Sequence, residues 1–275
     1  MALITGQQIS NYYQQFGEVE ISFNKEVIRA TGLQTRNNLL KCKGEYWPCF
    51  VYSTSMRTAK IVASVKSDFF NNVKEANNLV LLQLSFKQAD KTSPLILRIS
   101  AKMAGLTSYG EANSGLSLIT LAFTQRPSDD LIIILGRILE SNLNSKKRRE
   151  ERIIINDLVI RKLGLKSKNI IVLIENIPRK ALIRDISFSG SKLIIVGLAK
   201  FLVNKAIILR LEIEETGTSL NIPGKVLRFE PIENRKDIAS IAIQFDETKL
   251  PIEYKLLVND YISQKKPEKA KSEQS

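Results

Sequence analysis

The feature that most constrains the fold is the period of the apolar residues, which is strand-like along both halves of the chain. Short segments rich in β-branched and aromatic residues alternate with clusters of Gly, Asn, Ser and Pro. They are residues 19–23, 39–42, 49–53, 60–66, 79–86, 95–104 and 116–123, and then 159–163, 169–175, 181–186, 191–195, 206–213, 222–230 and 239–245. This pattern predicts a mainly β protein built from antiparallel strands.

Helical periodicity is confined to three places. Residues 6–16 have the apolar spacing of a short amphipathic helix, residues 131–139 follow a Pro-Ser-Asp-Asp start signal, and Pro251 opens the third helix. The last strand of each half is thus followed by a short loop, a proline and a helix. We expect two small antiparallel β-barrels, each followed by a C-terminal α-helix. Any small barrel capped by a helix would give this pattern, so duplication of one module is only one explanation.

Two domains are expected from the length of 275 residues. Residues 141–149 are polar and then densely basic, which is typical of a linker. The predicted division is a first domain at 1–140, a basic linker at 141–152, a second domain at 153–264 and a disordered tail at 265–275.

Composition excludes several classes of function. The chain has no histidine, which removes Ser-His-Asp catalysis, the usual zinc sites and the commonest general base. Its two cysteines, Cys42 and Cys49, suit isolated core positions rather than a disulfide framework. There is no apolar run long enough to cross a membrane, and the start carries no secretion signal. We therefore expect a cytoplasmic, non-enzymatic protein without a metal or cofactor.

The net charge of +13 predicts an acidic partner. Residues 1–140 hold 15 basic and 11 acidic side chains, net +4, and residues 141–275 hold 26 and 17, net +9. Nucleic acid, an anionic membrane face and a phosphorylated ligand would all suit this charge.

Two motifs near the start of the second half favour the phosphorylated ligand. Arg148 and Arg152 are separated by three residues, and Asp185, Ser187 and Gly190 follow at the end of an apolar strand. Each motif alone is most simply a charged turn or an ordinary strand end. Together they suit one task, because guanidinium groups bind phosphate or the guanine O6 and N7 atoms, while a carboxylate accepts from guanine N1 and N2.

Arg148-x-x-x-Arg152 followed by Asp185-x-Ser187-x-x-Gly190 resembles the paired RxxxR and (D/N)xSxxG motifs of PilZ domains. These domains are receptors for the bacterial second messenger cyclic di-GMP. The resemblance extends over residues 145–262, including the segments 149–153, 222–228 and 241–245. The layout of the whole chain, including residues 24–32 and 47–49, is similar to the tandem PlzA-type proteins of spirochaetes.

The resemblance implies a degenerate PilZ-like first domain and a second domain that binds cyclic di-GMP. Arg29 and Arg36 have the wrong spacing for the first motif, and no second motif follows them. In the second domain, Arg148 and Arg152 would hold phosphate and guanine edges, and Asp185, Ser187 and Gly190 would line the barrel face. Secondary candidates for contacts with the ligand are Lys147 and Arg149.

The predicted function is therefore a monomeric receptor that changes its interdomain arrangement on binding cyclic di-GMP and regulates an unknown downstream protein. Because Arg148 and Arg152 lie in the predicted linker, closing them on a ligand would couple ligand binding to the orientation of the domains. The alternative is a basic protein that binds RNA or DNA through charge, and it depends on charge alone.

Overall fold

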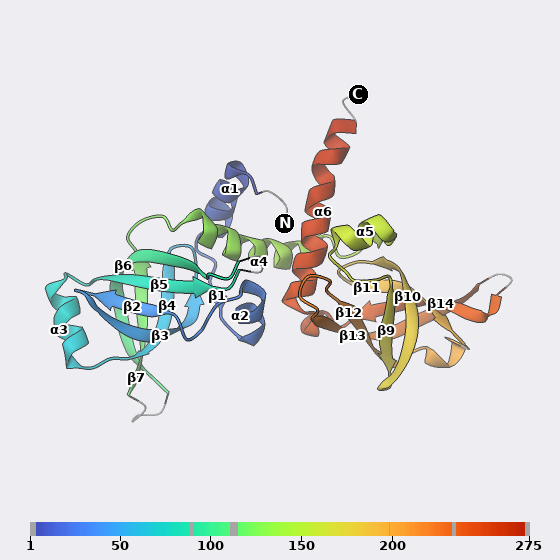
Figure 1. Cartoon of the computed structure of the whole chain (residues 1–275), viewed down its shortest axis with the longest axis horizontal. Helices are drawn as coiled ribbons and strands as arrows, with labels where there is room; N and C mark the ends of the chain where they lie inside the picture. The colour runs from blue at the N-terminus through green and yellow to red at the C-terminus, as the bar shows by residue number, and fades with distance from the viewer. Residues whose placement is uncertain (1–3, 89–90, 111–114, 198, 233–234, 273–275) are drawn as a thin grey trace. The chain divides into compact units, whose positions relative to one another are not determined.

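The chain folds into two compact units, residues 3–139 and 140–275. The computed structural model describes residues 4–88, 91–110, 115–197, 199–232 and 235–272. Each unit contains its own closed barrel (Figure 1). The expectation of a mainly β fold with two antiparallel barrels, each followed by a helix, is confirmed.

The first barrel is a ring of six antiparallel strands in the order β3-β2-β5-β6-β7-β4, closed by pairing of β3 with β4. The short strand β1 pairs with β3 outside the ring. The elements are α1 Gly6–Phe16, β1 Ile21–Ser22, α2 Lys25–Thr31, β2 Leu39–Cys42, β3 Glu45–Thr54, β4 Thr58–Ser64, α3 Ser67–Glu75, β5 Leu79–Phe86, β6 Leu95–Tyr109, β7 Leu116–Phe123 and α4 Asp129–Lys147.

The second barrel has the ring order β10-β9-β12-β13-β14-β11, closed by pairing of β10 with β11, and β8 pairs with β10 outside the ring. Its elements are β8 Ile153–Ile154, α5 Asp157–Lys162, β9 Asn169–Ile174, β10 Ile177–Ile186, β11 Gly190–Val196, η1 Ala199–Leu202, β12 Ala206–Glu212, β13 Ser219–Ile232, β14 Arg235–Phe245, η2 Glu247–Lys249 and α6 Ile252–Ser272.

The two barrels share their connectivity, strand for strand. The first seven-strand set runs β1-β3-β2-β5-β6-β7-β4, and the second repeats it as β8-β10-β9-β12-β13-β14-β11. Both also carry a bulge at the same place, between Val51 and Ser53 in β3 and between Ile183 and Asp185 in β10. This repeated arrangement is what duplication of one module would give, and it allows the two units to be compared residue by residue.

Several local expectations are corrected. Residues 159–163, predicted as a strand, lie in and after helix α5, because the Asn156 side chain caps the helix by accepting from the Val159 N–H at 2.9 Å. The β-branched residues Val159 and Ile160 favour a strand, but the cap at Asn156 stabilises a helix here. Helix α4 continues to Lys147, so the first part of the predicted linker is helical.

The C-terminal helix also differs from expectation. Helix α6 runs to Ser272 and includes most of the segment predicted to be disordered, while residues 273–275 lie outside those described. Of the helices that the structure describes, none combines the length and apolarity needed to cross a bilayer.

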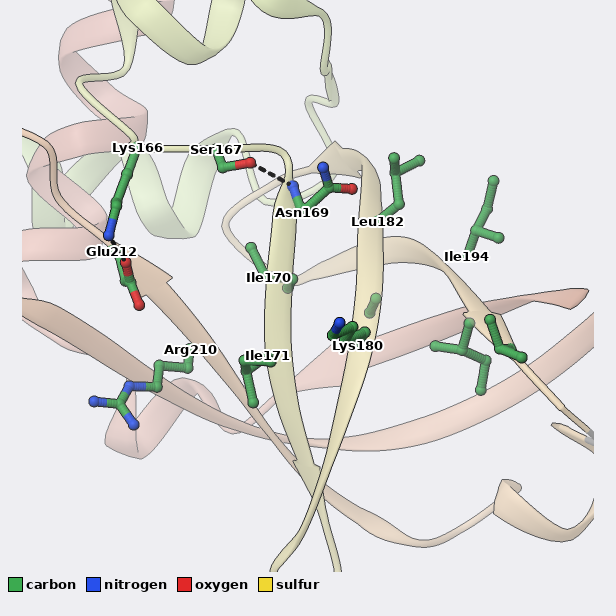
Figure 2. Close-up of a pocket in the computed structure, with 13 residues that line it drawn as sticks. Lys166, Ser167, Asn169, Ile170, Ile171, Lys180, Leu182, Ile194, Arg210 and Glu212 are labelled. Atoms are coloured by element: carbon green, nitrogen blue, oxygen red, sulfur yellow. Dashed lines mark hydrogen bonds and ion pairs between the residues drawn. The ribbon is translucent and has the colours of Figure 1, made fainter.

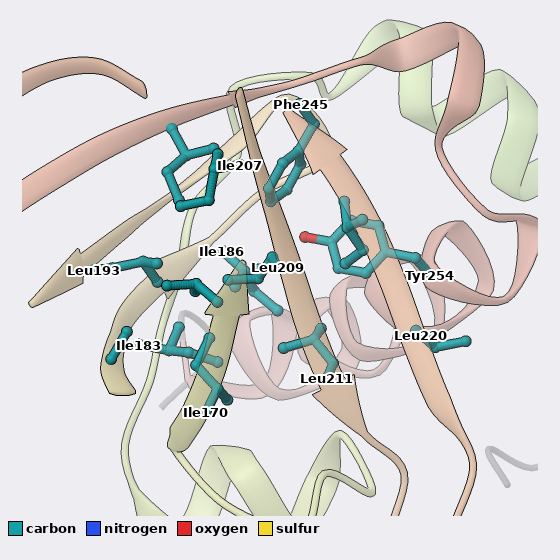
Figure 3. Packing of buried hydrophobic residues seen from close by; sticks show 14 of the residues in the cluster. Ile170, Ile183, Ile186, Leu193, Ile207, Leu209, Leu211, Leu220, Phe245 and Tyr254 are labelled. Carbon is teal, nitrogen blue, oxygen red and sulfur yellow. The ribbon is translucent and has the colours of Figure 1, made fainter. Parts of the chain in front are cut away.

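The interior of the second barrel holds aliphatic side chains from every strand of the ring (Figure 3). Ile183, Leu193, Leu209 and Ile241 are buried there, and each contributes about 1.5–3 kcal/mol by removal from water. The Tyr254 ring of α6 closes the cluster with an edge contact to Phe245, at 5.6 Å between ring centroids. This core fixes the strand ends that carry the second motif.

Candidate functional site

Strand pairing brings the two motifs together. Ile153 and Ile154 of β8 pair with Ile186 and Asp185 of β10, so Arg152 lies at the end of β10. Its Nη1 atom donates to Asp185 Oδ1 at 2.5 Å. The side chain of Arg152 is 44% exposed and that of Asp185 only 9%, so the arginine is the more accessible partner.

Asp185 is held in place from two sides. Besides Arg152, its Oδ1 atom accepts from the backbone N–H of Lys192 at 3.1 Å. Its own carbonyl accepts from Ser191 Oγ at 2.7 Å. The carboxylate is therefore a fixed acceptor, since two groups bond to its Oδ1 atom and a third holds the backbone of the same residue.

Ser187 shapes the turn of residues 186–190, here called the motif turn. Its backbone N–H donates to the Gly190 carbonyl at 2.8 Å, and its Oγ atom accepts from the Gly190 N–H at 3.1 Å. Ser187 is fully buried. These bonds satisfy the backbone of a tight connection between β10 and β11.

Gly190 is required by packing. A Cβ atom at this position would lie 2.2 Å from the Ile243 carbonyl oxygen on β14. Gly190 does not have a positive φ, so close approach of the two strands is the reason for the glycine. The β14 backbone occupies the space that a side chain at this position would need.

The basic candidates before β8 differ in their surroundings. Arg148 follows the last turn of α4, where its N–H donates to the Asn144 carbonyl at 2.8 Å, and its side chain is half-buried. Arg149 is tied to Glu247 at 2.6 Å, so its guanidinium is already partnered. Lys147 is exposed. Among the described residues, Lys147 and Arg148 have no ion pair.

Tyr254 of α6 was missed by sequence reasoning. It is fully buried, and its hydroxyl donates to the Ser187 carbonyl at 2.7 Å. Burial, and then the charge of Asp185, raise the pKa of Tyr254, so the hydroxyl remains protonated and keeps donating to the motif turn. The position of Tyr254 one turn after Pro251 predicts that its ring packs in the core. No pattern in the sequence predicts that its hydroxyl bonds to Ser187, which is 67 residues away.

Helix α6 also holds the end of α4 that leads to Arg148. Asn144 Nδ2 donates to Asn259 Oδ1 at 2.7 Å in a buried contact, and Asn259 Nδ2 donates to Glu140 Oε2 at 3.1 Å. One helix therefore anchors both halves of the site, the motif turn through Tyr254 and the chain before Arg148 through Asn259.

The equivalent place in the first barrel has the opposite charge. Ile21 and Ser22 of β1 pair with Thr54 and Ser53, as Ile153 and Ile154 pair with Ile186 and Asp185, which places Glu20 where the second barrel has Arg152. Glu20 bonds to Ser53 and to Lys60, which together lower the pKa of Glu20.

The turn itself survives in the first barrel. The Thr58 N–H donates to Ser55 Oγ at 3.0 Å, as that of Gly190 does to Ser187 Oγ. By the same alignment Phe16, a buried residue, takes the place of Arg148. The first barrel thus repeats the strand pairing and the turn of the site, but it lacks the two arginines and the carboxylate.

The arrangement in the second unit can bind an anion that also carries hydrogen-bond donors. Guanidinium groups attract phosphate, and the fixed Asp185 carboxylate repels it unless a donor group faces the carboxylate. No group of three metal-ligating side chains occurs within the described ranges.

Several known proteins and one domain model are similar to this chain. The PilZN3 domain model matches residues 7–142. A cyclic di-GMP binding protein of Treponema denticola is 39% identical over 263 residues, which cover 96% of this chain and 84% of the relative. The chain belongs to the PilZ family. The family prediction made from the motif residues is therefore confirmed.

Solved structures of other PilZ proteins also match the chain. Borreliella burgdorferi PlzA in complex with cyclic di-GMP is 25% identical, with a TM-score of 0.42, over 93% of this chain and 98% of that one. Escherichia coli YcgR in complex with cyclic di-GMP is 12% identical, with a TM-score of 0.29, over 98% and 95%.

Proposed function

We propose that this PilZ protein is a non-enzymatic receptor for cyclic di-GMP that binds the ligand in its second unit. Arg148 and Arg152, here called the clamp, would bind phosphate and guanine edges. Asp185 would accept from guanine N1 and N2, and Ser187 and Gly190 would hold the motif turn against the ligand. Lys147 is a secondary contact, and Arg149 becomes available only if its bond to Glu247 opens.

The observation that carries this proposal is the meeting of Arg152 with a buried acceptor carboxylate at the end of β10. A site for phosphate alone would gain nothing from Asp185, whereas a guanine nucleotide has donors that match it. The Treponema denticola relative, a cyclic di-GMP binding protein, supports the same ligand.

We further propose that ligand changes the arrangement of the two units. Helix α4 begins in the first unit and ends at Lys147, immediately before the clamp. Closing Arg148 and Arg152 on a ligand would restrict the segment that leaves this helix. The changed arrangement would then be recognised by a downstream protein, and we expect the receptor to act as a cytoplasmic monomer. The nucleic-acid alternative still depends on net charge alone, and we do not propose it.

The test is a calorimetric titration of the full chain with cyclic di-GMP, its linear dinucleotide, cyclic di-AMP and a short RNA, each at two salt concentrations. Cyclic di-GMP should bind most tightly, with an affinity that changes little with salt. Binding of all four anions with one steep dependence on salt would instead indicate a charged surface.

A further inference from the structure

A groove lies on the outer face of the second barrel, away from every residue of the candidate nucleotide site. Its volume is about 600 Å³. It is formed by residues of β9, β10, β11 and β12 and of the loop before β9, as Figure 2 shows. None of the clamp, Asp185 or the motif turn lines it.

Strand register shows which side chains face the groove. One row crosses the sheet from Arg210 to its partner Ile171 and then to Lys180, the partner of Ile171 on β10. Because Ala181 pairs with Ile195, the next residue Val196 lies beside Lys180 and continues the row on β11. Ile171 and Val196 are 36% and 67% exposed. The alternating residues Ile170, Ala181 and Ile195 are buried in the core, so the exposed row is the outer face.

A second row continues the same surface. Asn169 pairs with Leu182, and Leu182 with Ile194, and both of these aliphatic side chains are half-buried. The floor of the groove is thus aliphatic over three adjacent strands. An aliphatic floor of this kind in a groove can hold an apolar side chain of another molecule.

The charge of the groove is positive and incompletely paired. Lys166, Lys180 and Arg210 oppose one carboxylate, Glu212, and that carboxylate is bonded to Lys166 at 2.8 Å. Within the described residues, Lys180 and Arg210 have no ion pair, and they lie on either side of Ile171. Two strand spacings, roughly 10 Å, separate their backbones.

These features specify the chemistry of an occupant. Lys180 and Arg210, which have no ion pair within the described residues, can bind carboxylates, and the aliphatic row between them can bind an apolar side chain. A peptide segment in which acidic residues flank a Leu, Ile or Val residue supplies both. A nucleic acid or a membrane surface would use the cations and leave the concave aliphatic floor unfilled.

We propose that this outer groove is the docking site for an acidic, aliphatic segment of a partner protein. The site is separate from the nucleotide site and would bind by contacts between side chains. Lys180 and Arg210 would pair with the carboxylates, and Ile171, Leu182 and Val196 would bury the apolar residue.

The test uses the full chain and a fluorescently labelled peptide of eight residues, Gly-Glu-Leu-Glu-Ile-Glu-Leu-Gly, in an anisotropy titration. Two further peptides replace either every Glu by Lys or every Leu and Ile by Ser. The protein variants are Lys180→Glu with Arg210→Glu, Ile171→Ser with Val196→Ser, and the control Lys225→Glu, an exposed strand lysine outside the groove.

The proposal expects the acidic aliphatic peptide to bind the unaltered chain and the control variant with equal affinity. Each groove variant should weaken binding at least tenfold, the Ser peptide should bind at least tenfold more weakly, and the Lys peptide should bind only the charge-reversed variant. Equal binding of the acidic peptide to the charge-reversed variant, or equal binding of the Ser peptide, would overturn the proposal. So would absence of binding at millimolar peptide, or displacement of bound peptide by RNA or by vesicles of anionic lipid at equal charge.

Discussion

At the residue scale, Asp185 is the most informative position, because a negative charge is unfavourable in a site for a phosphorylated ligand. Its bonds to Arg152 and to the Lys192 N–H fix the carboxylate. A ligand with donors can replace the arginine on this carboxylate, while a bare anion cannot. In the proposed site, Asp185 would therefore determine which anion binds rather than how strongly anions are attracted.

We expect Asp185→Ala to weaken binding of cyclic di-GMP by about 1–3 kcal/mol, roughly 5- to 150-fold. Cyclic di-AMP, which lacks the guanine N1 and N2 donors, should bind no more weakly than before. Titrations of both ligands on the same variant measure this. A variant that binds both ligands more tightly by equal factors would show that Asp185 acts only as a repelling charge.

Arg148→Ala and Arg152→Ala should each remove charge-assisted hydrogen bonds to the ligand, worth about 1.5–3 kcal/mol. The thermal unfolding midpoint should change little for Arg148→Ala, because Arg148 has no ion pair within the described residues. Arg152→Ala should lower the midpoint somewhat, because it leaves the nearly buried Asp185 carboxylate without its charged partner. Arg179→Ala on β10 is the matched control, since Arg179 is exposed and outside both motifs. If the variant with both Arg148→Ala and Arg152→Ala kept full affinity for cyclic di-GMP, the proposed role of these two arginines in binding would be wrong.

At the element scale, α6 links the two halves of the site, and Tyr254 and Asn259 do this on one helix. The position of the motif turn thus depends on a helix that contributes no motif residue. This is a positioning role, because the hydroxyl of Tyr254 is buried and donates to a backbone carbonyl.

Tyr254→Phe should separate affinity from stability. Loss of the hydroxyl costs about 1–2 kcal/mol of unfolding free energy and frees the motif turn, so the affinity for cyclic di-GMP should fall about fivefold or more. The control is Val258→Ala on the same helix, a fully buried residue whose truncation should cost about 2 kcal/mol of stability.

The control variant should keep its affinity, measured well below its unfolding midpoint. If affinity instead followed stability in both variants, Tyr254 would be an ordinary core residue.

The sequence predicted most elements and both motifs, and what it missed was decided by contacts. The segments at 79–86 and 116–123 match β5 and β7 because their apolar runs are bounded by clear turn residues. Helix α5 was missed because Val159 and Ile160 favour strands until the Asn156 cap is known. The role of Tyr254 was missed because its partner Ser187 is distant along the chain.

At the scale of the whole molecule, two barrels of one topology carry opposite charges at the same place. Glu20 in the first unit and Arg152 in the second occupy equivalent positions beside β1 and β8. The first unit is therefore not expected to bind the nucleotide by the mode proposed for the second. Its contribution to signalling would come through its position, which α4 connects to the clamp.

We expect cyclic di-GMP to change the distance between labels on Lys74→Cys in α3 and Thr216→Cys after β12. The native thiols should stay unlabelled, since Cys42 and Cys49 are buried and burial raises the pKa of Cys49 to about 12. Pulsed electron spin resonance measures the distance distribution. An unchanged distribution at saturating ligand would mean that the signal stays on the second unit.

Closure of both rings determines how this protein can be recognised. Within the described ranges, only the two-residue strands β1 and β8 lie outside a ring, although the long strands β6 and β13 each pair with a given neighbour over only part of their length. Other β proteins can add a strand from a partner, or aggregate, through open sheet edges. Where a strand is paired on both sides in its ring, neither route is open, so recognition there depends on the side chains of the outer faces. Those faces can be altered by substitution while the hydrogen bonds that close each ring remain unchanged.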